Sequence, residues 1–231
     1  MIQYSPMPRN ERVDVGGEVY HVINRGNGRQ TIFQNEEDYL LFESLLEHAK
    51  EFIVDMRIIA YTIMPNHWHL VLYPKKDGDL SLFMHWLTTS HTRKHHVMKE
   101  NIGGGHLYQG RYKSFLVDTD SYFLSVFKYV ERNPMRAKLT ENCEDWRWGS
   151  SWRRSNGSEK EKKLLSSPLV DFPEKYSVWI NKPEKEDDVV KIRNSINKGV
   201  PYGRDIWSMD MVEKYELSSS LNKPGRPKKK H

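Results

Sequence analysis

The sequence contains one cysteine, Cys143, among its 231 residues. A single thiol can form neither an intramolecular disulfide nor a cysteine-rich zinc ribbon. We therefore expect a reducing compartment, and metal ligands drawn from histidine, carboxylate or amide side chains. No run approaches the roughly 18 consecutive apolar residues that span a membrane, and the N-terminal segment lacks the apolar core of a signal peptide. These absences predict a cytoplasmic protein that does not enter a membrane.

Excess charge is absent from most of the chain. There are 36 Lys and Arg against 31 Asp and Glu, but five of the basic residues and none of the acidic ones follow Glu216. The other 31 basic residues equal the acidic ones in number, so the net charge of +5 belongs to the tail. We interpret residues 217–231 as a flexible basic tail in which Arg226 and Lys228 contact nucleic-acid phosphates. The sequence around Arg226 is also similar to the core of an AT-hook.

Composition divides the chain after residue 152. Residues 1–152 carry enough aromatic and β-branched segments for one domain, whereas the run RRSNGSEKEKK that follows has no apolar residue. Such a run is typical of a solvated segment, so we expect a polar linker or loop over residues 153–165. Residues 166–216 regain Leu, Val, Ile and Trp, which predicts a small helical accessory region before the tail.

Hydrophobic periodicity within the first domain alternates between strand-like and helix-like segments. Asn35 is a candidate helix cap, and Pro134 disfavours helix at the residue before it. The order of elements favours an α+β fold, with a mainly antiparallel sheet and helices packed on one side of it. The predicted strands are 18–24, 56–64 and 67–73, with an extended segment at 106–117; the predicted helices are about 35–50, 80–98 and 120–133.

Two histidines, His67 and His69, flank Trp68 at the start of a predicted strand. Because side chains alternate along a strand, both imidazoles project from one face and the indole from the other. Imidazole is a common ligand of divalent cations, so the pair is a candidate metal site on a rigid sheet. Taken alone, the motif is also consistent with two histidines that share an exposed face. His21 on the first strand either approaches this site or fills the core.

The third predicted helix places Tyr129 and Asn133 one turn apart on one face, beside an apolar stripe. A phenol hydroxyl and an amide oxygen are therefore expected to lie close together on this face. The alternative is that Tyr129 is an amphipathic residue at a helix boundary, and that Asn133 ends the helix before a proline.

Cationic and aromatic side chains alternate at Arg111, Tyr112 and Lys113. Proteins that bind single strands or hairpins use such an arrangement, in which charges follow the backbone and rings stack on bases. Tyrosine is also common in ordinary strands, so the same run fits a purely structural strand.

Four motifs follow one another in order between residues 15 and 152. They are Tyr20-His21-Val22 followed by Arg25-Gly26, Met64-Pro65-Asn66-His67-Trp68-His69, Gln109-Gly110-Arg111-Tyr112-Lys113 and Tyr129-Val130-Glu131-Arg132-Asn133-Pro134. In their order and spacing these motifs resemble those of the single-tyrosine HUH transposases, in particular the REP-associated tyrosine transposases. The resemblance implies an HUH endonuclease fold with a ferredoxin-like or RRM-like core, followed by a helical C-terminal extension.

The resemblance also implies a reaction. Carried over residue by residue, it gives His67 and His69 the role of holding Mg²⁺ or Mn²⁺, with Asn133 completing the metal shell. Tyr129 becomes the nucleophile that attacks a DNA phosphate, forming a 5′-phosphotyrosine and releasing a 3′-OH.

The partner that the resemblance implies is single-stranded or hairpin DNA, bound by a monomer associated with the nucleoid.

The ordinary pKa of a tyrosine hydroxyl is about 10, so a nearby cation must favour its deprotonation, and Lys113 and Arg132 are candidates. The residues expected to contact DNA in the first domain are Arg25, Arg111, Tyr112, Lys113 and Arg132.

Two other functions stay open from the sequence. A domesticated regulator that binds hairpins without cutting needs only the basic and aromatic surface. A metal-dependent phosphodiesterase that uses water would leave Tyr129 dispensable and form no covalent intermediate. The joint presence of His67, His69, Tyr129 and Asn133 favours the strand transferase.

Overall fold

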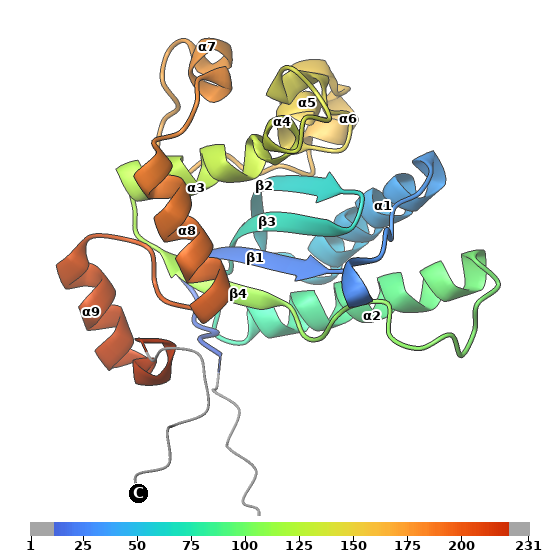
Figure 1. Cartoon of the computed structure of the whole chain (residues 1–231), viewed down its shortest axis with the longest axis horizontal. Coiled ribbons are helices and arrows are strands. Elements are labelled where there is room, and N and C mark those ends of the chain that lie inside the picture. Colours follow the sequence, from blue (N-terminus) through green and yellow to red (C-terminus); the bar gives the residue numbers. More distant parts are fainter. Residues whose placement is uncertain (1–11, 222–231) are drawn as a thin grey trace, which may run out of the picture.

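The computed structural model describes residues 12–221 and contains a four-stranded antiparallel sheet (Figure 1). Its spatial order is β2-β3-β1-β4, and every neighbouring pair is antiparallel. The register of β1 on β3 places Ile23 opposite His69 and Arg25 opposite His67. The strands are β1 (Val19–Arg25), β2 (Arg57–Met64), β3 (His67–Tyr73) and β4 (Lys113–Val117).

The α+β fold predicted from the sequence is confirmed. The three predicted strands match β1, β2 and β3 to within one residue, and the three predicted helices match α1 (Glu36–Phe52), α2 (Asp79–Met98) and α3 (Ser121–Glu131). Asn35 caps α1 as expected, in a capping box with Asp38. Of the predicted extended segment 106–117, only the end forms a strand, β4.

Helices α1 and α2 cover one face of the sheet. On that face, Trp68, Leu70 and Leu72 of β3 belong to one buried cluster with Phe42 of α1 and Phe83 of α2. These three β3 residues alternate with the histidines, so the predicted division of β3 into an apolar face and a histidine face is observed.

The opposite face is also covered by helices, which corrects the expectation of helices on one side only. There Val71 and Phe115 pack with Phe127 of α3 and Ile192 of α8 (Glu186–Lys198). Every residue of β2 after Arg57 is buried. A strand whose side chains are buried on both faces requires cover on both sides of the sheet, and α3 with α8 supplies the second cover.

Residues 153–165 differ from the polar linker or loop expected there, because they carry the end of α5 and all of α6. The Arg153 side chain is 2% exposed and pairs with Glu43 and Glu47 of α1. The polar run packs against the domain because α1 supplies these counter-charges. Within residues 12–221, no helix is both long and apolar enough to cross a membrane. The other short elements are α4 (Asn133–Arg136), α5 (Ser150–Asn156), α6 (Glu159–Lys162), α7 (Tyr176–Asn181), α9 (Asp205–Lys214), η1 (Asn27–Arg29), η2 (Cys143–Asp145) and η3 (Ser218–Leu221).

Helix α3 is attached to the sheet at its C-terminal end. Pro134 has no N–H, so it cannot donate to the carbonyl of Val130 four residues earlier. The hydroxyl of Thr62 on β2 donates to that carbonyl instead, at 2.9 Å. The missing helical bond is thereby replaced by a bond to the strand beneath.

A buried carboxylate, Glu131, makes the second attachment of α3. It accepts hydrogen bonds from Ser150 Oγ at 2.5 Å and from the Ser151 amide at 2.9 Å. Arg154 pairs with it at 2.9 Å, and the Glu131 side chain is 1% exposed. The end of α3 is therefore tied to α5 through a charge that solvent does not reach.

Replacing Arg154 by alanine should leave Glu131 buried without its counter-charge, a change that typically costs about 3–5 kcal/mol of unfolding free energy. Burial raises the pKa of Glu131, with Arg154 opposing the rise. A carboxyl group whose pKa is raised by folding stabilises the folded state fully when the pH is below its unfolded-state pKa. This stabilisation is lost as the pH rises through its folded-state pKa. We expect urea unfolding, followed by tryptophan fluorescence, to show a larger loss for Arg154→Ala near about pH 7 than near about pH 5.

Arg147→Ala is the matched control. Arg147 pairs with the buried Glu43, and when Arg147 is removed Glu43 still contacts Arg153 and the Tyr61 hydroxyl. We expect it to cost about 1 kcal/mol or less, with little dependence on pH. Equal losses in the two variants, or a loss in Arg154→Ala that does not change with pH, would contradict this account of Glu131.

Candidate functional site

A cavity of about 600 Å³ opens between the sheet and the helices α3 and α8. It is lined by His67 and His69 of β3 together with Tyr129 and Asn133 from the end of α3 and the start of α4. The structure thus brings together the four residues that the sequence singled out for chemistry. The other lining residues with polar side chains are Asn24, Arg25, Gln109, Arg111, Lys113, Arg193 and Asn197.

His67 keeps one ring nitrogen free. Its Nδ1 lies 2.6 Å from Asn66 Oδ1, and since an amide oxygen only accepts, Nδ1 carries the proton and Nε2 keeps its lone pair. Burial, together with the charges of Arg25 and Arg136, lowers the pKa of His67 to about 4. The imidazole is therefore neutral at physiological pH, the form that binds cations.

His69 contacts another imidazole. Its Nδ1 lies 2.8 Å from His21 Nε2, in a bond where one ring donates and the other accepts. Burial, followed by the nearness of His21 and His67, holds the pKa of His69 well below its ordinary value. Burial also lowers the pKa of His21 to about 3. The sequence left open whether His21 fills the core or approaches the site. It does both, because it is fully buried and contacts His69.

Asn133 follows Tyr129 by one helical turn even though α3 ends at Glu131. Arg132 keeps near-helical backbone angles (φ −85°, ψ 1°), and α4 begins at the next residue, so the chain continues in the same direction. Asn133 Nδ2 donates to the carbonyl of Tyr129 at 3.3 Å. Its Oδ1 is left as an uncharged ligand atom.

The Tyr129 side chain contacts an imidazole and a guanidinium. The residue is 5% exposed, and its ring meets that of His69 edge-on with centroids 5.9 Å apart. Arg136 of α4 lies over the ring face, with Cζ 4.0 Å from the centroid, and also donates to the Tyr129 carbonyl. This is a cation–π contact.

Arg136 was missed by the sequence analysis. It stands seven residues after Tyr129, which is the i, i+4, i+7 spacing of one helix face once Asn133 is included. The signal was therefore present, but Pro134 led us to end the helix before it.

A cationic rim borders the cavity. Arg25 ends β1 opposite His67, while Arg111 and Lys113 lie just before and at the start of β4, where both are exposed. Arg193 of α8 adds a fourth charge, which the sequence analysis did not predict. A concave surface lined by one sign of charge attracts phosphates.

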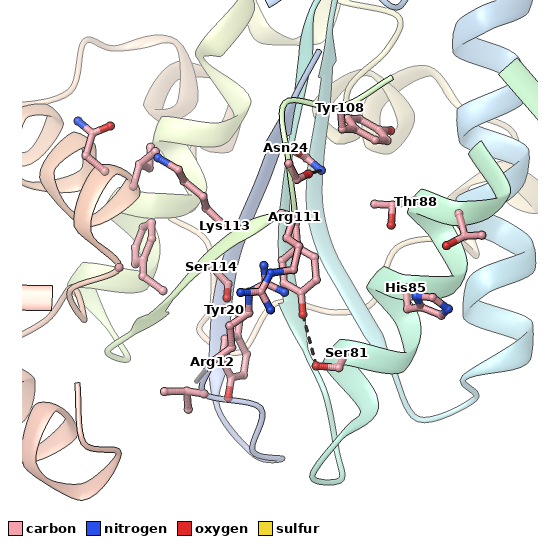
Figure 2. A pocket seen from close by; sticks show the side chains of 18 of the residues that line it. Arg12, Tyr20, Asn24, Ser81, His85, Thr88, Tyr108, Arg111, Lys113 and Ser114 are labelled. Carbon is pink, nitrogen blue, oxygen red and sulfur yellow. Dashed lines mark hydrogen bonds between the residues drawn. The ribbon is translucent and has the colours of Figure 1, made fainter. Parts of the chain in front are cut away.

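Tyr112 faces the other side of the sheet from its two neighbours. It is 7% exposed and packs within the cluster beneath α1 and α2, as expected from the alternation of side chains along the extended chain that leads into β4. It lines a second cavity of about 1090 Å³, which Figure 2 shows with Arg111, Lys113 and Ser81 labelled. The Tyr112 hydroxyl lies 3.4 Å from Ser81 Oγ. Arg111 and Lys113 line both cavities, and the other residues that line both are Asn24, Gly110, Ile196 and Asn197.

Arg132, expected to contact DNA and to act as a cation beside the tyrosine, lies away from the cavity. It is 7% exposed, its Nε binds the Glu184 carboxylate at 2.7 Å, and its Nη1 donates to the carbonyl of Asn181. A helical residue adjacent to the site in sequence points to a different side, and here a distant carboxylate holds it there. Arg226 and Lys228 lie outside the described residues.

The donor atoms of the site fit a divalent cation. Over the described part of the chain, no three His, Cys, Asp or Glu side chains converge as a metal cluster. The available set is therefore two neutral imidazoles, His67 and His69, with the amide oxygen of Asn133. Such a mixed nitrogen and oxygen set leaves positions for phosphate oxygens and water, and it suits Mn²⁺ or Mg²⁺.

A family of known proteins is similar to this chain in sequence, and a solved structure shares its fold. The family described as "Transposase IS200 like" matches residues 15–133. The structure of a REP-associated tyrosine transposase bound to a REP hairpin superimposes with a TM-score of 0.54 at 16% identity, over 72% of this chain and 95% of that chain. A protein of Deinococcus radiodurans R1 assigned as a transposase gives a TM-score of 0.37 at 17% identity, over 58% of this chain and 92% of its own. No curated protein matches the chain.

The matched region covers more than half of the chain and includes His67, His69, Tyr129 and Asn133. The expected fold of the REP-associated transposases is confirmed by the first structural match. On the extent of the family match, this chain belongs to the IS200-like transposase family.

Proposed function

We propose that the protein is a metal-dependent endonuclease and strand transferase for single-stranded DNA that forms a 5′-phosphotyrosine intermediate. The observation that carries the proposal is the convergence of Tyr129, His67, His69 and Asn133 on one cavity. A phenol, two neutral imidazoles and a free amide oxygen together offer a nucleophile and ligands for Mg²⁺ or Mn²⁺.

The chemistry follows from these groups. A bound Mg²⁺ or Mn²⁺ supplies a Lewis acid for the non-bridging oxygens of the scissile phosphate. The Tyr129 oxygen forms its bond to phosphorus as the bond to O3′ breaks; the phenol gives its proton to solvent and O3′ takes one up. One phosphate ester replaces another, so attack by a 3′-OH on the phosphotyrosine rejoins strands without an external energy source.

Hairpin-containing DNA is the substrate in this proposal. The REP-associated transposase of the same fold was solved with a REP hairpin bound. In this chain, Arg25, Arg111, Lys113 and Arg193 offer four cations at the mouth of the site. The second cavity shares Arg111 and Lys113 with the first, which supports a path for a strand that runs from one to the other.

A single chain acts as a monomer in this proposal. Tyr129 and both histidines line one cavity of the same chain. Helix α3 is attached to its own sheet through Thr62 and to its own α5 through Glu131. A DNA substrate also agrees with a nucleoid-associated location in the cytoplasm, which belongs to the same proposal.

Tyr129→Phe should abolish covalent capture of DNA. We expect the wild-type protein, incubated with end-labelled hairpin DNA and Mn²⁺, to form an adduct that survives SDS. Tyr129→Phe lacks the attacking oxygen and should form at least about 10³-fold less adduct. Tyr122→Phe is the matched control, because Tyr122 lies on the same helix but packs against Tyr202, and it should form adduct at the wild-type rate.

Each alternative function gives a different result in this assay. An adduct that persists in Tyr129→Phe would refute the assignment of the nucleophile. Cleavage without an adduct, unaffected by Tyr129→Phe, would identify a water-using phosphodiesterase. Hairpin binding without cleavage under any metal, unchanged in His67→Ala, would identify a regulator that binds and does not cut.

Asn66→Ala should weaken metal binding although Asn66 is not itself a ligand. Its Oδ1 holds the proton on Nδ1 of His67, and the loss of such a supporting bond typically lowers metal affinity by about 10- to 100-fold. The measurement is a Mn²⁺ titration of the DNA-free protein with free Mn²⁺ followed by EPR. Asn156→Ala is the control, since Asn156 is exposed and bonds only the Glu144 carbonyl. Unchanged affinity in Asn66→Ala alongside a loss in His67→Ala would contradict this role.

Arg111→Ala and Lys113→Ala should each flatten the salt dependence of hairpin binding. Each lost phosphate contact removes about 0.7 from the slope of log K against log salt for a single strand. Fluorescence anisotropy at several salt concentrations measures the slope. Arg132→Gln is the control, because Arg132 is engaged with Glu184; a change there as large as in Arg111→Ala would contradict the assignment of the rim.

A further inference from the structure

Glu184 lies between α7 and α8, beyond residues 15–133 that the family match covers. Its side chain is 8% exposed and pairs with two arginines that follow Tyr129: Arg132 through Nε at 2.7 Å, and Arg136 through Nη1. One buried carboxylate therefore binds both ends of the α3–α4 turn.

The Arg136 guanidinium contacts both Glu184 and Tyr129. Nη1 binds the carboxylate, Nη2 donates to the carbonyl of Tyr129, and the planar group lies over the phenol ring with Cζ 4.0 Å from its centroid. A guanidinium presents its donors in a fixed plane, so a bond at one end sets the orientation of the other end. The position of Arg136 over the ring is thereby linked to the position of Glu184.

The charge of Arg136 requires a nearby carboxylate, and Glu184 supplies it. Burial disfavours the charge of Arg136 and lowers its pKa, and the nearby charges of Arg193 and Arg132 act in the same direction. Glu184 is the strongest of the groups that oppose this effect. Without it, Arg136 would face the like charges of Arg193 and Arg132 with no carboxylate to oppose them, and turning toward solvent would lower its energy.

We propose that Glu184 is a positioning residue for Tyr129: it holds the Arg136 guanidinium on the phenol ring and thereby sets the direction in which the hydroxyl meets the scissile phosphate. The inference rests on the proposed role of Tyr129 as the nucleophile. It assigns part of the catalytic geometry to the region after residue 152, through a carboxylate that is not among the residues lining the cavity.

The contact between Arg136 and Tyr129 affects the reaction rate through the orientation of the Tyr129 hydroxyl. A ring that contacts the His69 imidazole and carries the Arg136 guanidinium over its face keeps its hydroxyl within a narrow range of directions. Displacement of a reacting group by about 1 Å can cost about 10²-fold in rate. The loss should therefore appear in the chemical step and leave DNA affinity unchanged.

The test is single-turnover adduct formation at saturating hairpin DNA with Mn²⁺. We expect Glu184→Gln and Arg136→Gln to slow the adduct by about 10- to 100-fold, with hairpin affinity within about threefold of wild type. Arg136→Lys keeps the charge but lacks the planar fork, so it should recover part of the rate.

Arg132→Gln is the matched control. It removes the other arginine from the same carboxylate and leaves the Glu184–Arg136 contact in place. We expect it to lower the thermal midpoint through its lost bonds to Glu184, Ile180 and Asn181, while it keeps the adduct rate within about threefold of wild type. A purely structural role for Glu184 predicts the opposite, with the rates of all three variants following their thermal midpoints.

A second measurement does not require cleavage. With 3-fluorotyrosine placed at position 129, the ¹⁹F resonance of the DNA-free protein reports the environment of the ring. We expect Glu184→Gln and Arg136→Gln to move this resonance toward that of fluorotyrosine in an unfolded chain, and Arg132→Gln to leave it in place. If the wild type forms no adduct, the proposed function fails, and this resonance still decides whether Glu184 positions the ring.

Two results would overturn the inference. The first is a wild-type adduct rate in a folded Glu184→Gln protein. The second is a ¹⁹F resonance that is the same in the wild type and in Glu184→Gln. If Glu184→Gln does not fold, Glu184→Asp, which shortens the side chain by one methylene, gives the same two readings.

Discussion

The pairing of β3 on both of its edges is the constraint on which the site depends. Held between β1 and β2, with helices on both faces, β3 cannot change its register without moving every side chain to the other face. The alternation that buries Trp68 beneath α1 and α2 also buries His69 beneath α3. Desolvation then keeps the imidazole neutral, so one strand supplies both the position and the protonation state of the proposed metal ligand His69.

Buried ion pairs on two sides fix the segment that carries Tyr129. Glu131 with Arg154 lies on one side, and Glu184 lies on the other. Such pairs add little net stability, because the cost of removing charges from water offsets most of their attraction. Their contribution here is geometric, since each carboxylate accepts several donors in fixed directions. For a helix that carries the proposed nucleophile, the direction of the Tyr129 hydroxyl matters more than additional stability.

Local periodicity was sufficient to predict the sheet and the pairing of residues on each face. It placed His67 with His69, and Tyr129 with Asn133, because both relations depend on neighbours in the chain. It could not predict that Arg132 turns to a carboxylate 52 residues away, or that the polar run after residue 152 packs on α1. The second layer of helices was missed for the same reason: β2 requires cover on both faces, and its sequence does not say which segment provides it.

The hydroxyl of Thr62 on the carbonyl of Val130 has a consequence for how the protein is assembled. Every helix leaves the carbonyls of its last turn without internal partners, and Pro134 also removes the N–H that a continuing helix would offer to Val130, so β2 supplies the donor through Thr62. The last turn around Tyr129 is therefore completed by a tertiary bond that exists only after the sheet has formed. Completion of the turn that carries Tyr129, the proposed nucleophile, is coupled in this way to cooperative folding of the domain.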